Sequence, residues 1–288
     1  MRISVVVPAH NEAGDIAHCL ERLIEQDGPI TEIIVVDNNS TDETPDLVRE
    51  AAVGDDRVVL ITEPRPGVAY ARYAGFAAAT GDVIVSVDSD TRVEPGWSTA
   101  IASAFSDNPR IAAGTCPMVM FDLPFQGAFS RRNLRLQARA QRHLKHGEIT
   151  PAPALSGANS AIRRTAWDDI ADKVSYRGDL FEDLDRSLLL QDAGHSLAIV
   201  PGMAATVSGR RLLSGPRSLL RYAACGPRTY AVHGKTREAA IAWVLNVVIV
   251  MRSSVLLPAN RAWDPDRGNF SLRRLLAREW QVRHSPIG

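Results

Sequence analysis

The strongest structural signal in this chain lies in the stretch Asp82-Val83-Ile84-Val85-Ser86-Val87-Asp88-Ser89-Asp90-Thr91. Its first half is apolar and rich in β-branched residues, which is typical of a buried strand. Its second half places the carboxylates of Asp88 and Asp90 where that strand ends. Ligands of open parallel α/β sheets bind beyond the carboxyl ends of the strands, and side chains two residues apart in an extended segment point the same way. The stretch therefore predicts a buried strand that presents two acidic side chains to a cleft.

The pair Asp88 and Asp90 is open to two interpretations at this point. Two carboxylates that point into one cleft suit a divalent cation that also holds a phosphate. Aspartate is also a common turn residue, and in that case the pair only ends the strand. The Asp-x-Asp pattern alone does not separate a metal site from a turn, so the surrounding sequence has to do so.

Three strand–helix units precede this stretch. We expect apolar strands at residues 3–7, 33–36 and 58–61, and helices at residues 14–25, up to residue 52, and 68–79. Ser40 and Glu43 fit a capping box that opens the second of these helices. Continuous apolar strands that alternate with helices predict an α/β fold with a mostly parallel central sheet and helices on both faces.

Polar residues follow each of the four predicted strands, at the same edge of the sheet. They are Asn11 and Glu12, Asp37 and Asn39, Arg65, and then Asp88 and Asp90. Four strands that carry polar side chains to one edge form a stronger signal than any single motif. We therefore expect this edge to bind a ligand of the size of a nucleotide.

The turn after the first strand lacks the Gly-x-Gly-x-x-Gly pattern, which argues against a dinucleotide site. Without a glycine-rich loop, another group must neutralise a phosphate. This requirement favours the metal interpretation of Asp88 and Asp90.

The second half of the chain gives weaker signals. We expect a strand over residues 111–120, a helix from about residue 181 to 193, a last strand at 196–200, and mostly helical structure afterwards. A helix at 130–146 carries six basic residues, which we interpret as a solvated face or, alternatively, as a face turned toward anions or a membrane. These residues are Arg131, Arg132, Arg135, Arg139, Arg142 and Lys145.

Composition and charge exclude several classes of protein. The 288 residues contain 33 Lys plus Arg and 33 Asp plus Glu, so no net field attracts nucleic acid and we expect no nucleic acid partner. Three scattered cysteines form neither a disulfide framework nor a zinc pattern. The N-terminus begins directly with a strand pattern, and we find no apolar run of the about 20 residues that a membrane span needs. We therefore expect a cytoplasmic protein.

The longest apolar segment covers residues 239–251. We favour a buried helix here. A helix that forms a homodimer, or one that makes a peripheral contact with the inner face of a membrane, is an alternative.

Taken in order, these segments resemble the family 2 glycosyltransferases, whose catalytic domain has the GT-A fold. The resemblance covers about residues 2–205 and implies a GT-A domain over 1–205, with a mostly helical extension over 206–288 packed on it. It rests on Val5-Val6-Val7-Pro8-Ala9-His10-Asn11-Glu12, Ile34-Val35-Val36-Asp37-Asn38-Asn39-Ser40-Thr41-Asp42, Pro66-Gly67, Ala71-Arg72-Tyr73-Ala74-Gly75, Gly81-Asp82, Asp88-Ser89-Asp90, Gly157-Ala158-Asn159 and Glu182-Asp183-Leu184-Asp185.

The resemblance implies an inverting, metal-dependent transfer of a sugar from a nucleotide diphosphate sugar, with UDP favoured, to an acceptor hydroxyl. Asp183 matches the general base of the family, and Glu182 is the second candidate. Asp90 would bind a divalent metal, Mg²⁺ or Mn²⁺, and Asp88 would contact the ribose or the metal. The other residues implied to bind the nucleotide sugar are Pro8, Asn11, Glu12, Asp37, Asn39, Arg65, Gly67, Ser89 and Gly157.

The third protein ligand of the metal in this family is often a His after the last strand. In this chain the segment reads Thr206-Val207-Ser208-Gly209-Arg210 and contains no His. Either Ser208 and water complete the metal shell, or Arg210 takes over part of the phosphate neutralisation.

Two other functions stay open. A sugar nucleotidyltransferase would need a Gly-rich, Arg-bearing loop after the first strand, where this chain has Pro8-Ala9-His10-Asn11-Glu12. A non-catalytic nucleotide-sugar-binding protein would not need the three acids at positions 88, 90 and 183, although the missing His keeps this alternative open. The acceptor is not readable from the sequence. The arginine clusters and the apolar helix permit an anionic or lipid-linked acceptor.

Overall fold

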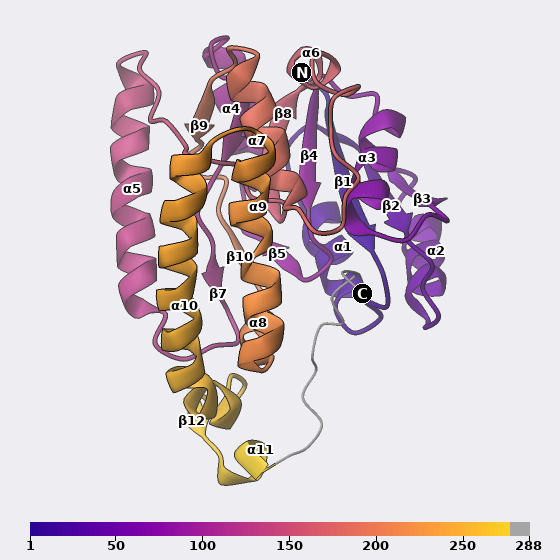
Figure 1. Ribbon diagram of the computed structural model, residues 1–288. Helices are drawn as coiled ribbons and strands as arrows, with labels where there is room; N and C mark the ends of the chain where they lie inside the picture. The colour runs from indigo at the N-terminus through magenta and orange to yellow at the C-terminus, as the bar shows by residue number, and fades with distance from the viewer. Residues whose placement is uncertain (277–288) are drawn as a thin grey trace.

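The computed structural model describes residues 1–276, and its centre is a mixed sheet of seven strands within those residues (Figure 1). The strand order across the sheet is β3-β2-β1-β4-β8-β6-β9. Only β8 runs against its neighbours β4 and β6, so the predicted mostly parallel sheet is confirmed. The strands are β1 (Ile3–Ala9), β2 (Ile30–Asp37), β3 (Val58–Thr62), β4 (Val83–Val87), β6 (Ala113–Thr115), β8 (Asn159–Arg163) and β9 (Leu197–Ile199).

Helices cover both faces of this sheet because its strands are apolar on both sides. Ile3, Val5 and Val7 of β1 face one core, whereas Val6 faces the other. The first core receives side chains from α1 (Ile16–Ile24), α2 (Thr44–Gly54) and α4 (Trp97–Asp107). The second receives them from α3 (Val68–Ala78), α5 (Gly127–Lys145), α6 (Arg164–Asp168) and α7 (Glu182–Asp192).

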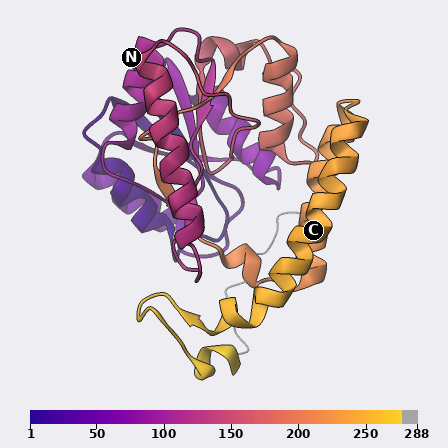
Figure 2. The ribbon, with the colours of Figure 1, turned by 90° about the vertical axis from the view of Figure 1, so that its left-hand side faces the viewer.

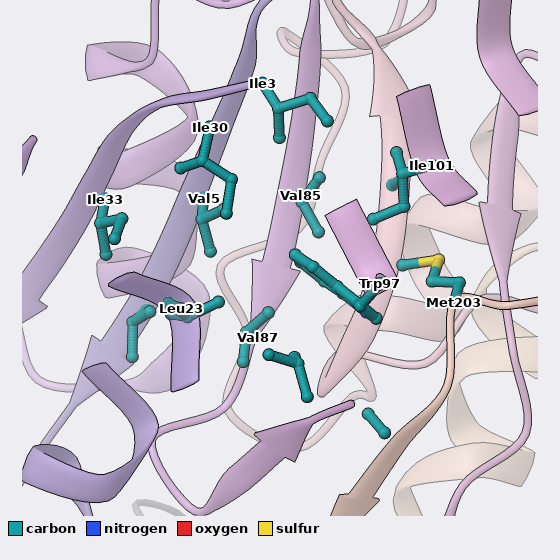
Figure 3. Close-up of a cluster of buried hydrophobic side chains, with 14 of the residues drawn as sticks. Ile3, Val5, Leu23, Ile30, Ile33, Val85, Val87, Trp97, Ile101 and Met203 are labelled. Atoms are coloured by element: carbon teal, nitrogen blue, oxygen red, sulfur yellow. The ribbon is translucent and has the colours of Figure 1, made fainter. Parts of the chain in front are cut away.

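The first core is organised around Trp97, which is fully buried between α4 and the sheet (Figure 3). Its ring lies near Val85, Ile101 and Met203, and its indole N–H donates to the Asn159 side chain at 3.0 Å. A buried indole N–H needs such a partner, so this bond fixes α4 relative to β8.

A second, smaller sheet joins distant parts of the chain. Its order is β5 (Thr91–Val93), β10 (Ala205–Val207) and β7 (Val119–Met120). Val207 of β10 pairs with Thr91 of β5 in antiparallel register. The segment that follows Val207 is therefore held beside the end of the Asp88-to-Asp90 turn.

Three local predictions are wrong. Residues 111–120 form two short strands, β6 and β7, because Pro117 lies between them and cannot donate a ladder hydrogen bond. Strand β10 follows residues 196–200, which we predicted to be the last strand. The capping box does not form: Glu43 is the N-cap of α2, and the Ser40 hydroxyl accepts the Asn11 N–H instead.

The region after β10 is helical, as predicted. It contains the 3₁₀ helix η1 (Arg210–Leu213), α8 (Pro216–Ala223), α9 (Cys225–Val232) and α10 (Thr236–Ala262), followed by β11 (Trp263–Asp264), β12 (Asn269–Phe270) and α11 (Leu272–Leu276). Helix α10 packs along α8 and α9 and forms one side of the molecule (Figure 2). Residues 277–288 of the predicted extension lie outside the described part of the chain.

Helix α10 contradicts two predictions. The helix has 27 residues and is long and apolar enough to cross a membrane, judged by length and composition alone. The prediction that the chain has no segment long enough for a membrane span is therefore wrong. Of residues 239–251 only Ala239 is buried, so the expected burial of this segment is also wrong. The helix continues past Arg252 because one charged residue does not end a helix. An apolar run alone does not tell a buried helix from an exposed one.

We predict that Gly75→Ala destabilises the protein by about 1–3 kcal/mol, because it overpacks the contact between α3 and the sheet. A Cβ at Gly75 would lie 2.3 Å from Val6 Cγ1 and 2.9 Å from Val36 Cγ2. Gly54→Ala in α2 is the matched control, since nothing lies within 4 Å of its Cβ position. Urea unfolding measures both variants, and equal stabilities would contradict this packing.

Candidate active site

The polar edge of the sheet opens into a cavity of about 460 Å³, which lies in the size range of small-molecule sites. Its walls come from the start of α3, the end of β4, the turn before β8, the loop before α7, the segment after β10, and helices α8 and α10. The cavity therefore lies between the sheet domain and the C-terminal helices.

Arg72 of α3 is the central cation of this site. Its side chain is 2% exposed. Its guanidinium donates to Asp88 Oδ1 at 2.9 Å, to the Gly157 carbonyl at 2.7 Å and to the Ser86 hydroxyl, and its Nε lies 3.2 Å from Glu182 Oε1. Burial acts to lower the pKa of Arg72, but the carboxylates of Asp88 and Glu182 hold that pKa above its ordinary value. Arg72 thus remains charged and connects β4, the turn before β8, and α7.

The two predicted catalytic acids open α7 and both line the cavity. Asp183 accepts the Gly157 N–H at 2.9 Å and the Leu184 N–H at 2.8 Å, one on each carboxylate oxygen. Each oxygen keeps a second lone pair for a proton, and the backbone fixes the orientation of the carboxylate. The Asp183 carboxylate therefore has a fixed orientation and can accept a further hydrogen bond or a proton.

Glu182 has a different environment. Its carboxylate faces the Arg72 guanidinium, and burial raises its pKa above the ordinary value although Arg72 opposes that shift. Glu182 therefore acts mainly as the ionic partner of Arg72. This contrast favours Asp183 over Glu182 as the base.

A second arginine enters from the segment after β10. Arg210 Nη2 lies 2.5 Å from Glu12 Oε2 and 3.2 Å from Asp90 Oδ2, and its Nη1 lies 3.1 Å from Asp15 Oδ2. The Asp90 side chain is 1% exposed, and the Arg210 side chain is 13% exposed. One guanidinium thus links three acidic side chains from two different loops.

The predicted metal ligands do not form a shared ligand pair in this arrangement. Asp88 faces Arg72, and Asp90 faces Arg210. Ser208, the proposed third ligand, donates its hydroxyl to Asp122 Oδ2 at 2.6 Å. Over residues 1–276, no group of three or more His, Cys, Asp or Glu side chains is arranged to hold a metal ion. The donor set therefore fits arginine ion pairs better than a divalent cation.

The predicted loop residues after β1 and β2 hold each other in place. Asn11 Oδ1 accepts the Thr41 N–H at 2.7 Å, and the Ser40 N–H donates to Asp37 Oδ1 at 3.2 Å. Asn11 and Asn39 have φ of 53° and 62°, a left-handed conformation that Asn tolerates. These contacts shape the polar edge.

Sequence reasoning missed Asn38, which fixes the next loop. Its side chain donates to the carbonyls of Glu63 and Arg65, each at 2.7 Å, and accepts the Gly67 N–H at 2.7 Å. The run of two Asn residues after a strand was the available signal, since Asn side chains commonly bond to nearby backbone.

The predicted site residues divide into two groups. Gly67, Asp88, Asp90, Gly157, Glu182 and Asp183 line the cavity, and the remaining predictions lie outside its lining: Pro8, Asn11, Glu12, Asp37, Asn39, Arg65 and Ser89. Glu12 is nevertheless joined to the cavity through Arg210. Arg65 is 62% exposed, pairs with Glu63 at 2.8 Å, and lies over the Tyr70 ring.

Arg72 was also missed as a site residue. The signal was available, because Arg72 is the only charged residue in the helix of residues 68–79, and such an arginine must either be exposed or find buried acidic partners. Asn246 and Ile249 of α10 line the cavity as well, and no local pattern indicates that contact.

We predict that Arg72→Met lowers the free energy of unfolding by about 3–5 kcal/mol, because it leaves the buried carboxylates of Asp88 and Glu182 without their cation. Arg49→Met is the control: Arg49 pairs with Asp46 on the surface of α2, with 63% of its side chain exposed, and should change stability by less than about 1 kcal/mol. Chemical denaturation measures both, and a similar loss in the two variants would contradict the role given to Arg72.

Comparisons with known proteins agree with this architecture. A family model described as Glycosyl transferase family 2 matches residues 4–171. The chain is 44% identical over 94 residues to succinoglycan biosynthesis protein ExoO of Rhizobium meliloti, covering 32% of this chain and 26% of that protein. It is 31% identical over 112 residues to the uncharacterized glycosyltransferase YibD of Escherichia coli, covering 38% of this chain and 33% of that protein. The matches thus span about a third or less of these relatives.

Two solved structures share the fold. The mannosyltransferase PcManGT of Pyrobaculum calidifontis, in complex with GDP-Man and Mn²⁺, has a TM-score of 0.64 at 20% identity, covering 91% of this chain and 75% of that one. A TarS 1-349 structure from S. aureus with UDP-GlcNAc has a TM-score of 0.57 at 16% identity, covering 90% and 84%. At these identities the likeness shows the fold alone, and the predicted GT-A fold is confirmed.

Proposed function

Since the chain belongs to glycosyl transferase family 2, we propose that it transfers a sugar from a nucleotide diphosphate sugar to an acceptor hydroxyl, with inversion at the anomeric carbon. The observation that carries this proposal is the shared cavity. It places the Asp183 carboxylate, held by backbone N–H groups, in the same space as the guanidinium groups of Arg72, Arg210 and Arg211.

The reaction needs a base for the acceptor and positive charge for the leaving group. Asp183 accepts the proton of the acceptor hydroxyl as that oxygen attacks the anomeric carbon. The bond between the anomeric carbon and the phosphate oxygen breaks as the new bond forms, and the electron pair leaves with the nucleoside diphosphate. Fixed cations near the departing diphosphate stabilise its growing charge, which is usually the largest catalytic contribution. A single displacement of this kind inverts the anomeric configuration.

A uridine diphosphate sugar is the first donor to test. This choice rests on the family. The solved structures with the same fold hold GDP-Man in one protein and UDP-GlcNAc in the other, so both bases belong in the screen. A divalent metal would polarise the diphosphate if it bound. The donor set found here does not fit that role, and no step of the proposed mechanism passes through a metal.

We further propose that the acceptor is lipid-linked and that α10 rests on an anionic membrane surface. Val244 and Val248 of α10 are 67% and 56% exposed, whereas Asn246 on the opposite side of the same helix lines the cavity. Helix α5 contributes charge complementarity, because its six predicted basic residues are all exposed and it carries no acidic residue. Apolar burial together with attraction to anionic lipids is the usual basis of interfacial binding.

We predict that Asp183→Asn lowers the transfer or donor-hydrolysis rate by about 10²–10⁴-fold, because it removes the general base. Asp192→Asn at the other end of α7 is the control, since Asp192 is 51% exposed and should leave the rate unchanged. The assay uses radiolabelled UDP-, GDP- and dTDP-sugars with and without Mn²⁺.

Three results would contradict this assignment. Near-normal turnover of the Asp183→Asn protein would remove Asp183 from the mechanism. Binding of the sugar nucleotides without any turnover would favour a non-catalytic binding protein. Cleavage that depends on added pyrophosphate would favour a nucleotidyltransferase.

We predict that the protein sediments with vesicles of phosphatidylglycerol at low salt, and less with phosphatidylcholine vesicles. The double variant Val244→Glu/Val248→Glu should lose that binding, because two charges oppose insertion of the apolar face. Val53→Glu is the matched control, since Val53 on α2 is 91% exposed and lies outside α5 and α10. The membrane contact would be contradicted if the wild-type protein and both variants formed the same soluble dimer and none of them bound vesicles. Loss of a dimer in the double variant alone would assign the apolar face to a second copy of the chain.

A further inference from the structure

We infer that Arg210 takes the place of a metal at Asp90 by pairing with its carboxylate, and that Arg211 supplies the positive charge that binds the donor diphosphate. The inference deepens the proposed function and rests on it. It follows that nucleoside diphosphate binding by this protein does not require a divalent cation.

The fold delivers Arg210 to the end of β4 by strand pairing. Thr91 lies one residue after Asp90 and pairs with Val207, so the chain that leaves β10 passes beside the Asp88-to-Asp90 turn. Gly209 and Ser208 are fixed there by Asp122, whose carboxylate accepts the Gly209 N–H and the Ser208 hydroxyl, both at 2.6 Å. Helix η1 begins immediately afterwards, at Arg210.

Three carboxylates hold the Arg210 guanidinium. Glu12 and Asp90 lie at 2.5 and 3.2 Å from Nη2, and Asp15 lies at 3.1 Å from Nη1. A guanidinium is planar and always charged, so such contacts fix its position as well as its charge. Asp90 thus already has a cationic partner at the place where the resemblance implies a metal.

Arg211 gives the site a second fixed cation. Its guanidinium carbon lies 3.8 Å from the centroid of the Tyr222 ring, and both residues line the cavity. Stacking on an aromatic ring restricts an arginine side chain without neutralising it. The Arg211 guanidinium matches the oxygens of a diphosphate, because it can donate two parallel hydrogen bonds. Arg210 contributes by pairing with the carboxylates that would otherwise repel the diphosphate.

Asp88, the other predicted metal ligand, also has an arginine partner. Asp88 accepts a hydrogen bond from Arg72 at 2.9 Å. A divalent cation held by Asp88 and Asp90 would lie close to the guanidinium groups that pair with them, and repulsion between these positive charges opposes its binding.

The test measures binding of UDP and uridine, and of GDP and guanosine, by calorimetry in EDTA and in Mn²⁺. In EDTA the wild-type protein should bind one diphosphate more tightly than its nucleoside. Arg211→Ala should weaken diphosphate binding by about 10- to 100-fold, the value of a charged hydrogen bond, with nucleoside binding unchanged. Arg210→Ala should also weaken diphosphate binding selectively, because it leaves the carboxylates of Glu12, Asp15 and Asp90 to repel the diphosphate. A merely structural role would weaken both ligands together.

Arg221→Ala is the matched control, because Arg221 is an exposed arginine on α8 and should not change either affinity. Thermal unfolding checks that each variant is folded. Arg211→Ala leaves the Arg210 ion pairs intact, so it reports on the diphosphate even where Arg210→Ala fails to fold.

Each of the other outcomes would overturn either the inference alone or the proposed function with it. Diphosphate binding by the wild-type protein only with Mn²⁺ would overturn the inference and leave the proposed glycosyl transfer standing. Unchanged diphosphate binding in both alanine variants would also overturn it. Binding of neither diphosphate in either buffer would overturn the proposed function itself, and the inference with it.

Discussion

The buried guanidinium of Arg72 is the interaction on which the site depends. It neutralises Asp88 at the end of β4 and Glu182 at the start of α7, and it holds the carbonyl of Gly157 between them. Gly157 in turn donates its N–H to Asp183. The position of the proposed base is thus set by a charge that lies in the core, two contacts away. A buried charge of this kind is maintained only when all of its partners are in place.

The small sheet brings residues that are far apart in the sequence into one group of ion pairs. Arg210 reaches Glu12, Asp15 and Asp90 because β10 pairs with β5. Other loops at the same edge of the sheet are braced by Asn11, Asp37 and Asn38 through hydrogen bonds to backbone groups. Polar residues at the sheet edge thus have two uses: some build the rim and others line the cavity.

Sequence patterns predicted the strands and helices of the first half of the chain. Alternating apolar strands and helices identified the sheet, because burial on both faces imposes continuous apolar runs. Sequence patterns did not predict the features that depend on contacts between distant elements of the chain. Whether Asp88 and Asp90 meet a metal or two arginines depends on Arg72 and Arg210, which come from other elements. The exposure of α10 likewise depends on what packs beside it, and composition does not contain that information.

One side of helix α10 faces the cavity, and the opposite side faces outward. Asn246 donates to the Ala223 carbonyl and lines the cavity, while Val244 and Val248 face outward. A helix with its side chains is about 10–12 Å across. When the outer side rests on a lipid surface, the thickness of this helix therefore sets the height of the cavity above the bilayer. Under the proposed membrane contact, acceptors would therefore be selected by how far their hydroxyl protrudes from the headgroups.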